Sequence, residues 1–153
     1  MSYVDKNLLP QETVVYRTRL HWIVYVPAML WVILALLAFA GSAKLQQWDT
    51  GKYVGAVLLL VGVLLAFIRW IQVASSEFAV TTKRVVIKVG LIRRHSVELL
   101  LRQVEGIGVE QGIMGRIFGY GSITVAGTGG TKEFFRQIAQ PLEFRRQVQT
   151  LSA

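Results

Sequence analysis

The sequence predicts an α+β membrane protein in which a hairpin of two transmembrane helices is joined to a small β-barrel or sheet capped by a C-terminal helix. Three observations predict this class: two long apolar runs, a strand-like alternation of residue types after them, and an amphipathic segment at the end of the chain. They divide the chain into an N-terminal segment, residues 1–21, a transmembrane hairpin, residues 22–74, and a cytoplasmic domain, residues 75–153.

The two apolar runs are long enough to cross a bilayer. Residues 23–43 contain no charge, and as a helix they would extend roughly 32 Å, against about 30 Å of hydrocarbon. The second span covers residues 53–74, where Arg69 near the end can extend its guanidinium to the interface. A buried helical hairpin of a soluble protein is the alternative, but the rest of a 153-residue chain is too short to cover two such helices.

Small residues recur along both predicted helices at spacings that place them on one face. Small side chains let helix backbones approach closely in lipid, where water no longer drives association. We therefore expect them to form the contact within the hairpin, with a contact between protomers as the alternative. These residues are Ala28, Ala35 and Ser42 in the first helix, and Gly51, Gly55, Gly62 and Ala66 in the second.

The distribution of basic residues predicts the orientation of the hairpin. Seven lysines and arginines flank the membrane ends of the two runs on the side of the termini, whereas the link between the runs contains two. Positive charge is enriched in cytoplasmic loops. Both termini are therefore expected in the cytoplasm, with the link on the other side.

The remaining chain reads as strands with a helix at the end. Residues 1–10 look like a loose start, and residues 12–19 read as a strand that enters the membrane directly and joins the barrel. A short helix is expected within the glycine-rich residues 112–121, and a longer amphipathic helix from Pro141. Further strands are predicted at residues 78–81, 84–89, 96–101, 104–110, 122–125 and 132–138, with a bulge at Gly106 or Gly108.

Two of these stretches resemble a known family. Residues 78–94, FAVTTKRVVIKVGLIRR, resemble the opening signature of bacterial pleckstrin-homology (PH)-like membrane proteins, and residues 101–125 resemble the second signature. A polar residue is usual in that family where Gly112 stands here. The resemblance implies a seven-stranded, partly open barrel closed by a C-terminal helix, in a multi-pass protein of the bacterial inner membrane. It implies no activity.

The sequence contains no apparatus for catalysis, and we expect neither enzyme activity nor a cofactor. Cysteine is absent, which excludes disulfides and thiolate chemistry. The two histidines, His21 and His95, have no ligand partner at metal-binding spacing. Residues 127–132 superficially resemble a phosphate-binding loop but lack its Gly-Lys-Ser/Thr ending.

Basic residues are concentrated after the second span, and the net charge is +8. Solubility and membrane topology are one explanation, and contact with anionic lipid headgroups is the other. A short link after the second span places Lys88, Arg93 and Arg94 near the bilayer, with Arg69 at the helix end, whereas Lys83 and Arg84 would lie farther away. Nucleic acid is not expected as a partner, because no exposed aromatics are interleaved with the charges.

Two functional hypotheses remain. The first is a membrane-anchored interaction or scaffold module that assembles with itself or with other membrane proteins. The second is a protein that binds anionic lipid headgroups.

Overall fold

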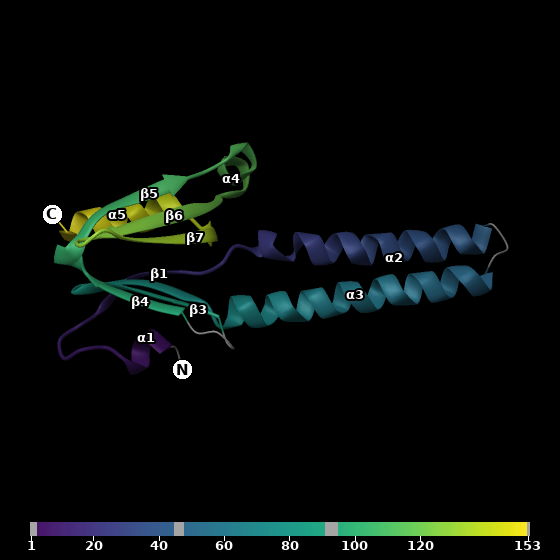
Figure 1. Ribbon diagram of the computed structural model, residues 1–153, viewed down its shortest axis with the longest axis horizontal. Helices are drawn as coiled ribbons and strands as arrows, with labels where there is room; N and C mark the ends of the chain where they lie inside the picture. The colour runs from purple at the N-terminus through teal and green to yellow at the C-terminus, as the bar shows by residue number, and fades with distance from the viewer. Residues whose placement is uncertain (1–2, 45–47, 91–94, 153) are drawn as a thin grey trace. The chain divides into compact units, whose positions relative to one another are not determined.

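The computed structural model describes residues 3–44, 48–90 and 95–152 (Figure 1). The chain forms two units. Residues 22–72 form a helical unit, and residues 1–21 together with residues 73–153 form a second unit, here called the β-unit. The β-unit is therefore assembled from chain segments on both sides of the hairpin.

The helical unit contains the short 3-10 helix η1 (Trp22–Tyr25) and two long helices, α2 (Val26–Lys44) and α3 (Trp48–Ala74). Two stretches, Trp22–Ala43 and Gly51–Ala74, are long and apolar enough to span a membrane. Most of their large side chains, including Leu37 and Leu60, point outward and are exposed. This apolar surface is suited to lipid rather than water.

Small residues lie where the two long helices approach each other. Ala28, Ala35 and Ser42 are buried, and Gly51 lies directly against Ser42. A Cβ atom added at Gly55 would lie 2.8 Å from the ring of Phe39. One added at Gly62 would lie 2.9 Å from Val32, whereas one added at Gly41 would touch nothing within 4 Å. Ala66 is half-buried and lines an apolar hollow with Ala28.

The β-unit contains two antiparallel sheets. The four-stranded sheet has the order β1 (Val14–Thr18), β2 (Glu77–Thr81), β3 (Arg84–Val89) and β4 (His95–Leu100). The three-stranded sheet has the order β5 (Val104–Glu110), β6 (Tyr120–Gly127) and β7 (Thr131–Ala139). The short helix η2 (Leu101–Gln103) connects β4 with β5, and β5 bulges between Val104 and Gly106.

The two sheets are joined where β1 continues toward the first span. Leu20 forms an antiparallel bridge with Ile138, the His21 amide donates to the Gln137 carbonyl at 2.7 Å, and the Ala139 amide donates to the Arg19 carbonyl at 3.0 Å. Gln137 has a φ of 57°, and the β6–β7 register shifts beside it. The spatial strand order is therefore β4-β3-β2-β1-β7-β6-β5, which is a partly open barrel.

Helix α5 (Pro141–Ser152) covers the interior of this barrel. Phe144 and Val148 on its apolar face are 0% and 1% exposed, as the sequence pattern predicted. The ring of Phe144 meets that of Tyr16 edge-on at 6.5 Å. Other fully buried side chains include Phe78, Ile87, Ile123, Val125 and Ile138.

The start of the chain differs from the expectation of a loose segment. Residues Tyr3–Lys6 form a short helix, α1, whose Val4 packs against Ala79 and Val86 on the outer face of the four-stranded sheet. Alternation along β3 puts Arg84 and Lys88 on the same face as Val86, and these two charges alone would predict a polar face. Val86 is nevertheless buried there, because α1 covers it.

Candidate membrane-surface site

A groove of about 450 Å³ lies in the β-unit beside the places where the chain meets the two spans. Its walls come from the end of β1, the last residues of α3 and the start of β2. The polar lining residues are Arg17, Thr18, Arg19, Ser76 and Glu77, and the apolar ones are Val4, Val73, Ala74, Phe78 and Ala79.

The covalent chain limits how far two residues of the groove lining can lie from the ends of the candidate spans. Arg19 precedes the first residue of the first span, Trp22, by three positions, and Ala74 is the last residue of the second span. Three residues of extended chain reach at most about 10 Å. Arg19 and Ala74, two residues of the groove lining, therefore lie within that distance of the ends of the two candidate spans.

Strand geometry places two arginines on the groove side of β1. Side chains alternate along a strand, so Tyr16 and Thr18 turn partly inward whereas Arg17 and Arg19 point outward and are exposed. Arg17 pairs with Asp5, and this hydrogen bond lowers the pKa of the Asp5 carboxyl. Within the described ranges no carboxylate pairs with Arg19.

Glu77 is the one acidic residue in the groove lining. Its carboxylate accepts hydrogen bonds from the backbone amides of Tyr3 and Val4 at 2.9 and 3.2 Å, and so fixes the start of α1 at the groove. Lys88 pairs with Glu77 in the β2–β3 register, and its Nζ lies 4.6 Å from the centre of the Tyr3 ring. The lining thus carries two positive charges and one negative charge.

The residues that the sequence predicted to contact lipid lie in different parts of the chain. Lys88 is half-buried beneath Tyr3, and Arg69, in the helical unit, donates to the Gln72 side chain at 2.8 Å. Arg93 and Arg94 lie outside the described residues. Sequence reasoning did not assign Arg17 and Arg19 to the site, although the alternation in residues 12–19 already placed them on one face of a strand.

Lys83 and Arg84, the other two basic residues of the predicted cluster, contact the N-terminal segment. Lys83 Nζ donates to the Pro10 carbonyl at 2.8 Å. Arg84 Nε lies 3.0 Å from the carboxylate of Glu12, and its guanidinium also pairs with Glu98. Arg84 is therefore part of the scaffold that holds the two chain segments together.

Glu12 is the buried centre of that scaffold. Its side chain is 0% exposed and accepts hydrogen bonds from Thr81 Oγ1 and the Leu9 amide, both at 2.6 Å. Burial acts to raise the pKa of Glu12, but these hydrogen bonds and the Arg84 guanidinium outweigh it, so the pKa lies below its usual value. Glu12 is thus ionised at neutral pH and joins residues on either side of the hairpin.

The arrangement of the groove suits electrostatic binding of an anion. An arginine guanidinium presents a planar fork of donors that matches a phosphate or carboxylate. In the part of the chain that the structure describes, no group of three or more His, Asp or Glu side chains is placed to hold a metal ion. The histidines lie apart, with His21 stacked on Tyr120 at 5.3 Å between ring centres and His95 3.0 Å from Glu133.

A family model and a known relative match the chain. The family model described as "Bacterial PH domain" matches residues 22–152. The UPF0699 transmembrane protein YdbT of Bacillus subtilis (strain 168) is 29% identical over 91 residues, which cover 56% of this chain and 18% of that protein. The chain thus aligns with less than a fifth of the length of this relative.

One solved structure also matches the chain. It is a DUF1696 family protein with a pleckstrin-homology domain from Shewanella loihica PV-4, with a TM-score of 0.48, 7% identity, and coverage of 98% of this chain and 90% of that one. The family match spans both apolar helices and the strands β2 to β7, and the described fold combines those helices with a PH-like barrel. The chain belongs to the bacterial PH domain family.

Proposed function

We propose that this chain is a non-enzymatic, membrane-anchored PH-like module that binds anionic lipid headgroups in the groove beside the membrane-entry points. The observation that carries the proposal is the unpaired charge of Arg19 among the described residues, next to Arg17, in a groove held at the bilayer surface by both connections to the spans. The ligand class is the phosphate of an anionic phospholipid.

The energetics favour a modest, selective interaction. Each basic residue near an anionic surface contributes about 1 kcal/mol. Asp5 compensates the charge of Arg17, and Glu77 lies in the same lining, so Arg19 makes the largest contribution. Lys88 supplements it from β3. Arg93, Arg94 and Arg69 remain proposed lipid contacts on the strength of the sequence alone. Zwitterionic headgroups should bind less well, because they offer no net charge to the arginines.

The proposal places the groove at the cytoplasmic leaflet of the bacterial inner membrane. The asymmetry of seven basic residues against two supports this orientation. Anionic lipids at that surface attract basic segments that lie within about one Debye length, roughly 8–10 Å in physiological salt. The short chain connections of Arg19 and Ala74 to the spans support a position within this distance.

Native mass spectrometry of the full chain released from nanodiscs tests the proposal. The discs contain phosphatidylglycerol and phosphatidylethanolamine in equal amounts, and the retained lipids of each kind are counted. We expect the wild type to retain phosphatidylglycerol preferentially and Arg19→Gln to lose most of that preference. Arg145→Gln, on the exposed surface of α5, removes the same charge and should not change it. Equal preference in all three proteins would contradict the proposal.

A second candidate function is an interaction or scaffold module, and the open barrel favours it. Strands β4 and β5 end their sheets, and within the described ranges each pairs with a neighbouring strand on one side only. A free strand edge is a template for pairing with another chain. We propose a second copy of this chain or another membrane protein as the partner. Particles extracted from native membranes with a polymer would then contain more than one chain, whereas single chains alone would contradict this candidate.

A further inference from the structure

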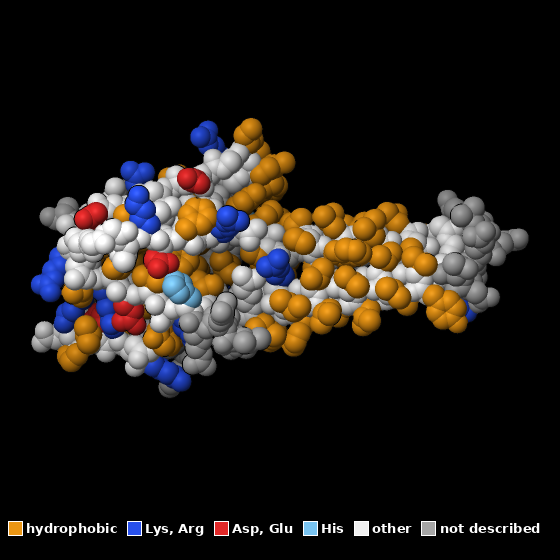
Figure 2. Space-filling view, viewed as in Figure 1, with side chains coloured by type: hydrophobic (Ala, Val, Ile, Leu, Met, Phe, Trp, Pro, Cys, Tyr) orange, Lys and Arg blue, Asp and Glu red, His pale blue; other side chains and the backbone are white. Residues whose placement is uncertain are grey.

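A second surface of the β-unit, separate from the groove, has the character of a membrane contact. Helix α4 (Ile113–Phe118) exposes four large apolar side chains. Their exposed fractions are 81% for Ile113, 61% for Met114, 68% for Ile117 and 46% for Phe118. Figure 2 shows hydrophobic side chains gathered over this helix. Such a concentration on six residues marks an interaction site.

The glycines of this segment explain why the apolar side chains point away from the sheet. Gly115 is buried, and a Cβ atom there would lie 2.5 Å from the Tyr120 carbonyl oxygen, which a side chain does not tolerate. The Gln111 amide donates to that oxygen at 3.0 Å, and Gly119 ends the helix with a φ of 75°. The glycine face is thus held against β6, and the opposite, apolar face is displayed on a fixed backbone.

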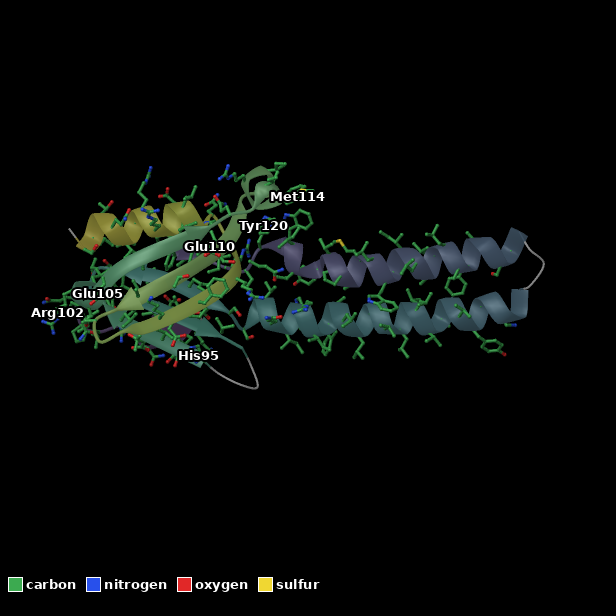
Figure 3. All side chains as sticks on the ribbon, turned by 45° about the horizontal axis from the view of Figure 1, so that its top comes forward. His95, Arg102, Glu105, Glu110, Met114 and Tyr120 are labelled. Carbon is green, nitrogen blue, oxygen red and sulfur yellow. The ribbon has the colours of Figure 1, made fainter. Side chains whose placement is uncertain are left out.

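Helix α4 lies at the end of the β-unit that connects to the first span. The ring of Tyr120 stacks on that of His21 at 5.3 Å, and the Gln140 amide donates to the Gly119 carbonyl at 2.9 Å. His21 immediately precedes Trp22, where the span begins. Figure 3 shows Met114 and Tyr120 at this end of the β-unit, and Arg102 and Glu105 at the other.

The direction of the His21 pKa shift agrees with apolar surroundings. Burial lowers the pKa of the His21 imidazole, and a hydrogen bond with the Phe118 backbone opposes this only in part. The neutral form of the ring is therefore favoured. Arg116, exposed on α4 itself, supplies a positive charge at the border of the apolar face.

We propose that α4 is an interfacial anchor whose apolar side chains insert into the headgroup–acyl boundary of the bilayer that the hairpin spans. The occupant is the bilayer because the helix is fastened to the residue before the span and therefore lies at the level of the interface. Its composition, large apolar residues with one arginine, is that of an interfacial element. This contact rests on the membrane spans and on α4, and it is independent of headgroup binding in the groove.

Single-cysteine labelling of the full chain in nanodiscs tests this inference, since the natural sequence contains no cysteine. Met114→Cys and Ile117→Cys are labelled with a small environment-sensitive fluorophore. Thr128→Cys, exposed in the turn at the opposite end of β6, is the control. The discs contain either ordinary phosphatidylcholine or phosphatidylcholine brominated on its acyl chains, and a water-soluble quencher is added separately.

We expect brominated lipid to quench the labels at positions 114 and 117 at least twofold more than the label at position 128, and the aqueous quencher to do the reverse. Arg19→Gln should leave this pattern unchanged, which separates the anchor from the proposed groove. Labels at 114 and 117 that are as accessible to water as the label at 128 would overturn the inference. Protection from water without quenching by lipid would also overturn it, because a second protein chain would then be the occupant.

Discussion

Replacing Glu12 with glutamine tests how the chain segments before and after the hairpin are held together. The change keeps the size of the side chain but removes the negative charge. The Glu12 carboxylate is buried and accepts hydrogen bonds from Thr81, the Leu9 amide and Arg84 at 2.6–3.2 Å. Arg84 itself has a side chain that is only 12% exposed. The substitution therefore leaves a largely buried guanidinium without its nearest counter-ion.

Removing one partner of a buried ion pair typically costs about 3–5 kcal/mol. Arg84 keeps its pairs with Glu98 and the Asn7 carbonyl, so we expect the lower end of that range, about 3 kcal/mol. Each 1.4 kcal/mol is a factor of ten, so the opening equilibrium of the β2–β3 region should rise roughly a hundredfold. Hydrogen exchange followed by mass spectrometry measures this directly in peptides that cover residues 77–89.

The lowered pKa of Glu12 adds a pH dependence to this prediction. Its ionised form stabilises the folded state fully above the unfolded pKa of about 4.3, and this contribution is lost as the pH falls through the lower folded-state pKa. The wild type should therefore lose protection in β2–β3 on acidification, and Glu12→Gln should lose less. Glu105→Gln on the exposed part of β5 is the control. Exchange in Glu12→Gln that matches the wild type would refute the reasoning.

Three further predictions concern the hairpin, the split β-unit and the orientation. Gly62→Leu should destabilise the helix pair by about 1–3 kcal/mol, because even the Cβ atom of the new side chain would press on Val32. Gly41→Ala is the control and should not destabilise the pair, because position 41 faces open space. Loss of helical circular dichroism in denaturant measures both. A fragment of residues 76–153 should lack a cooperative unfolding transition, because β1 and the buried Leu20 join the two sheets; a monomeric, cooperatively folding fragment would contradict this. Reporter fusions at residue 48 and at the C-terminus should give opposite signals, and a signal from outside the cytoplasm at the C-terminus would contradict the expected orientation.

Much of the fold could be predicted because it depends on local patterns. The apolar runs identify the hairpin without any knowledge of tertiary contacts. Alternation identifies the strands, and the glycine-rich stretch identifies α4. Gly112, where the family usually has a polar residue, is the N-cap residue of α4. A Cβ atom at this position would meet nothing within 4 Å. A polar residue there would cap the helix.

The features that were missed depend on contacts between distant residues. Helix α1 has four residues, too few for a periodic signal, and the carboxylate of Glu77, more than 70 positions away, holds its first amides. Arg84 and Glu12 are also more than 70 positions apart in the sequence. Arg84 therefore looks like a surface charge in the sequence but pairs with the buried Glu12 in the structure. The sequence places Arg17 and Arg19 on one face of a predicted strand. Only the structure shows that both residues line a groove.

Photo-crosslinking of lipid headgroups is the most direct test of binding in the groove. The full chain is placed in nanodiscs that contain phosphatidylglycerol or phosphatidylethanolamine with a photoreactive headgroup, and crosslinked peptides are mapped by mass spectrometry. We expect phosphatidylglycerol crosslinks at residues 17–19 and 73–77, a large decrease of these with Arg19→Glu, and few crosslinks there with phosphatidylethanolamine. Equal labelling of these residues by both lipids, unchanged by Arg19→Glu, would contradict headgroup binding in the groove.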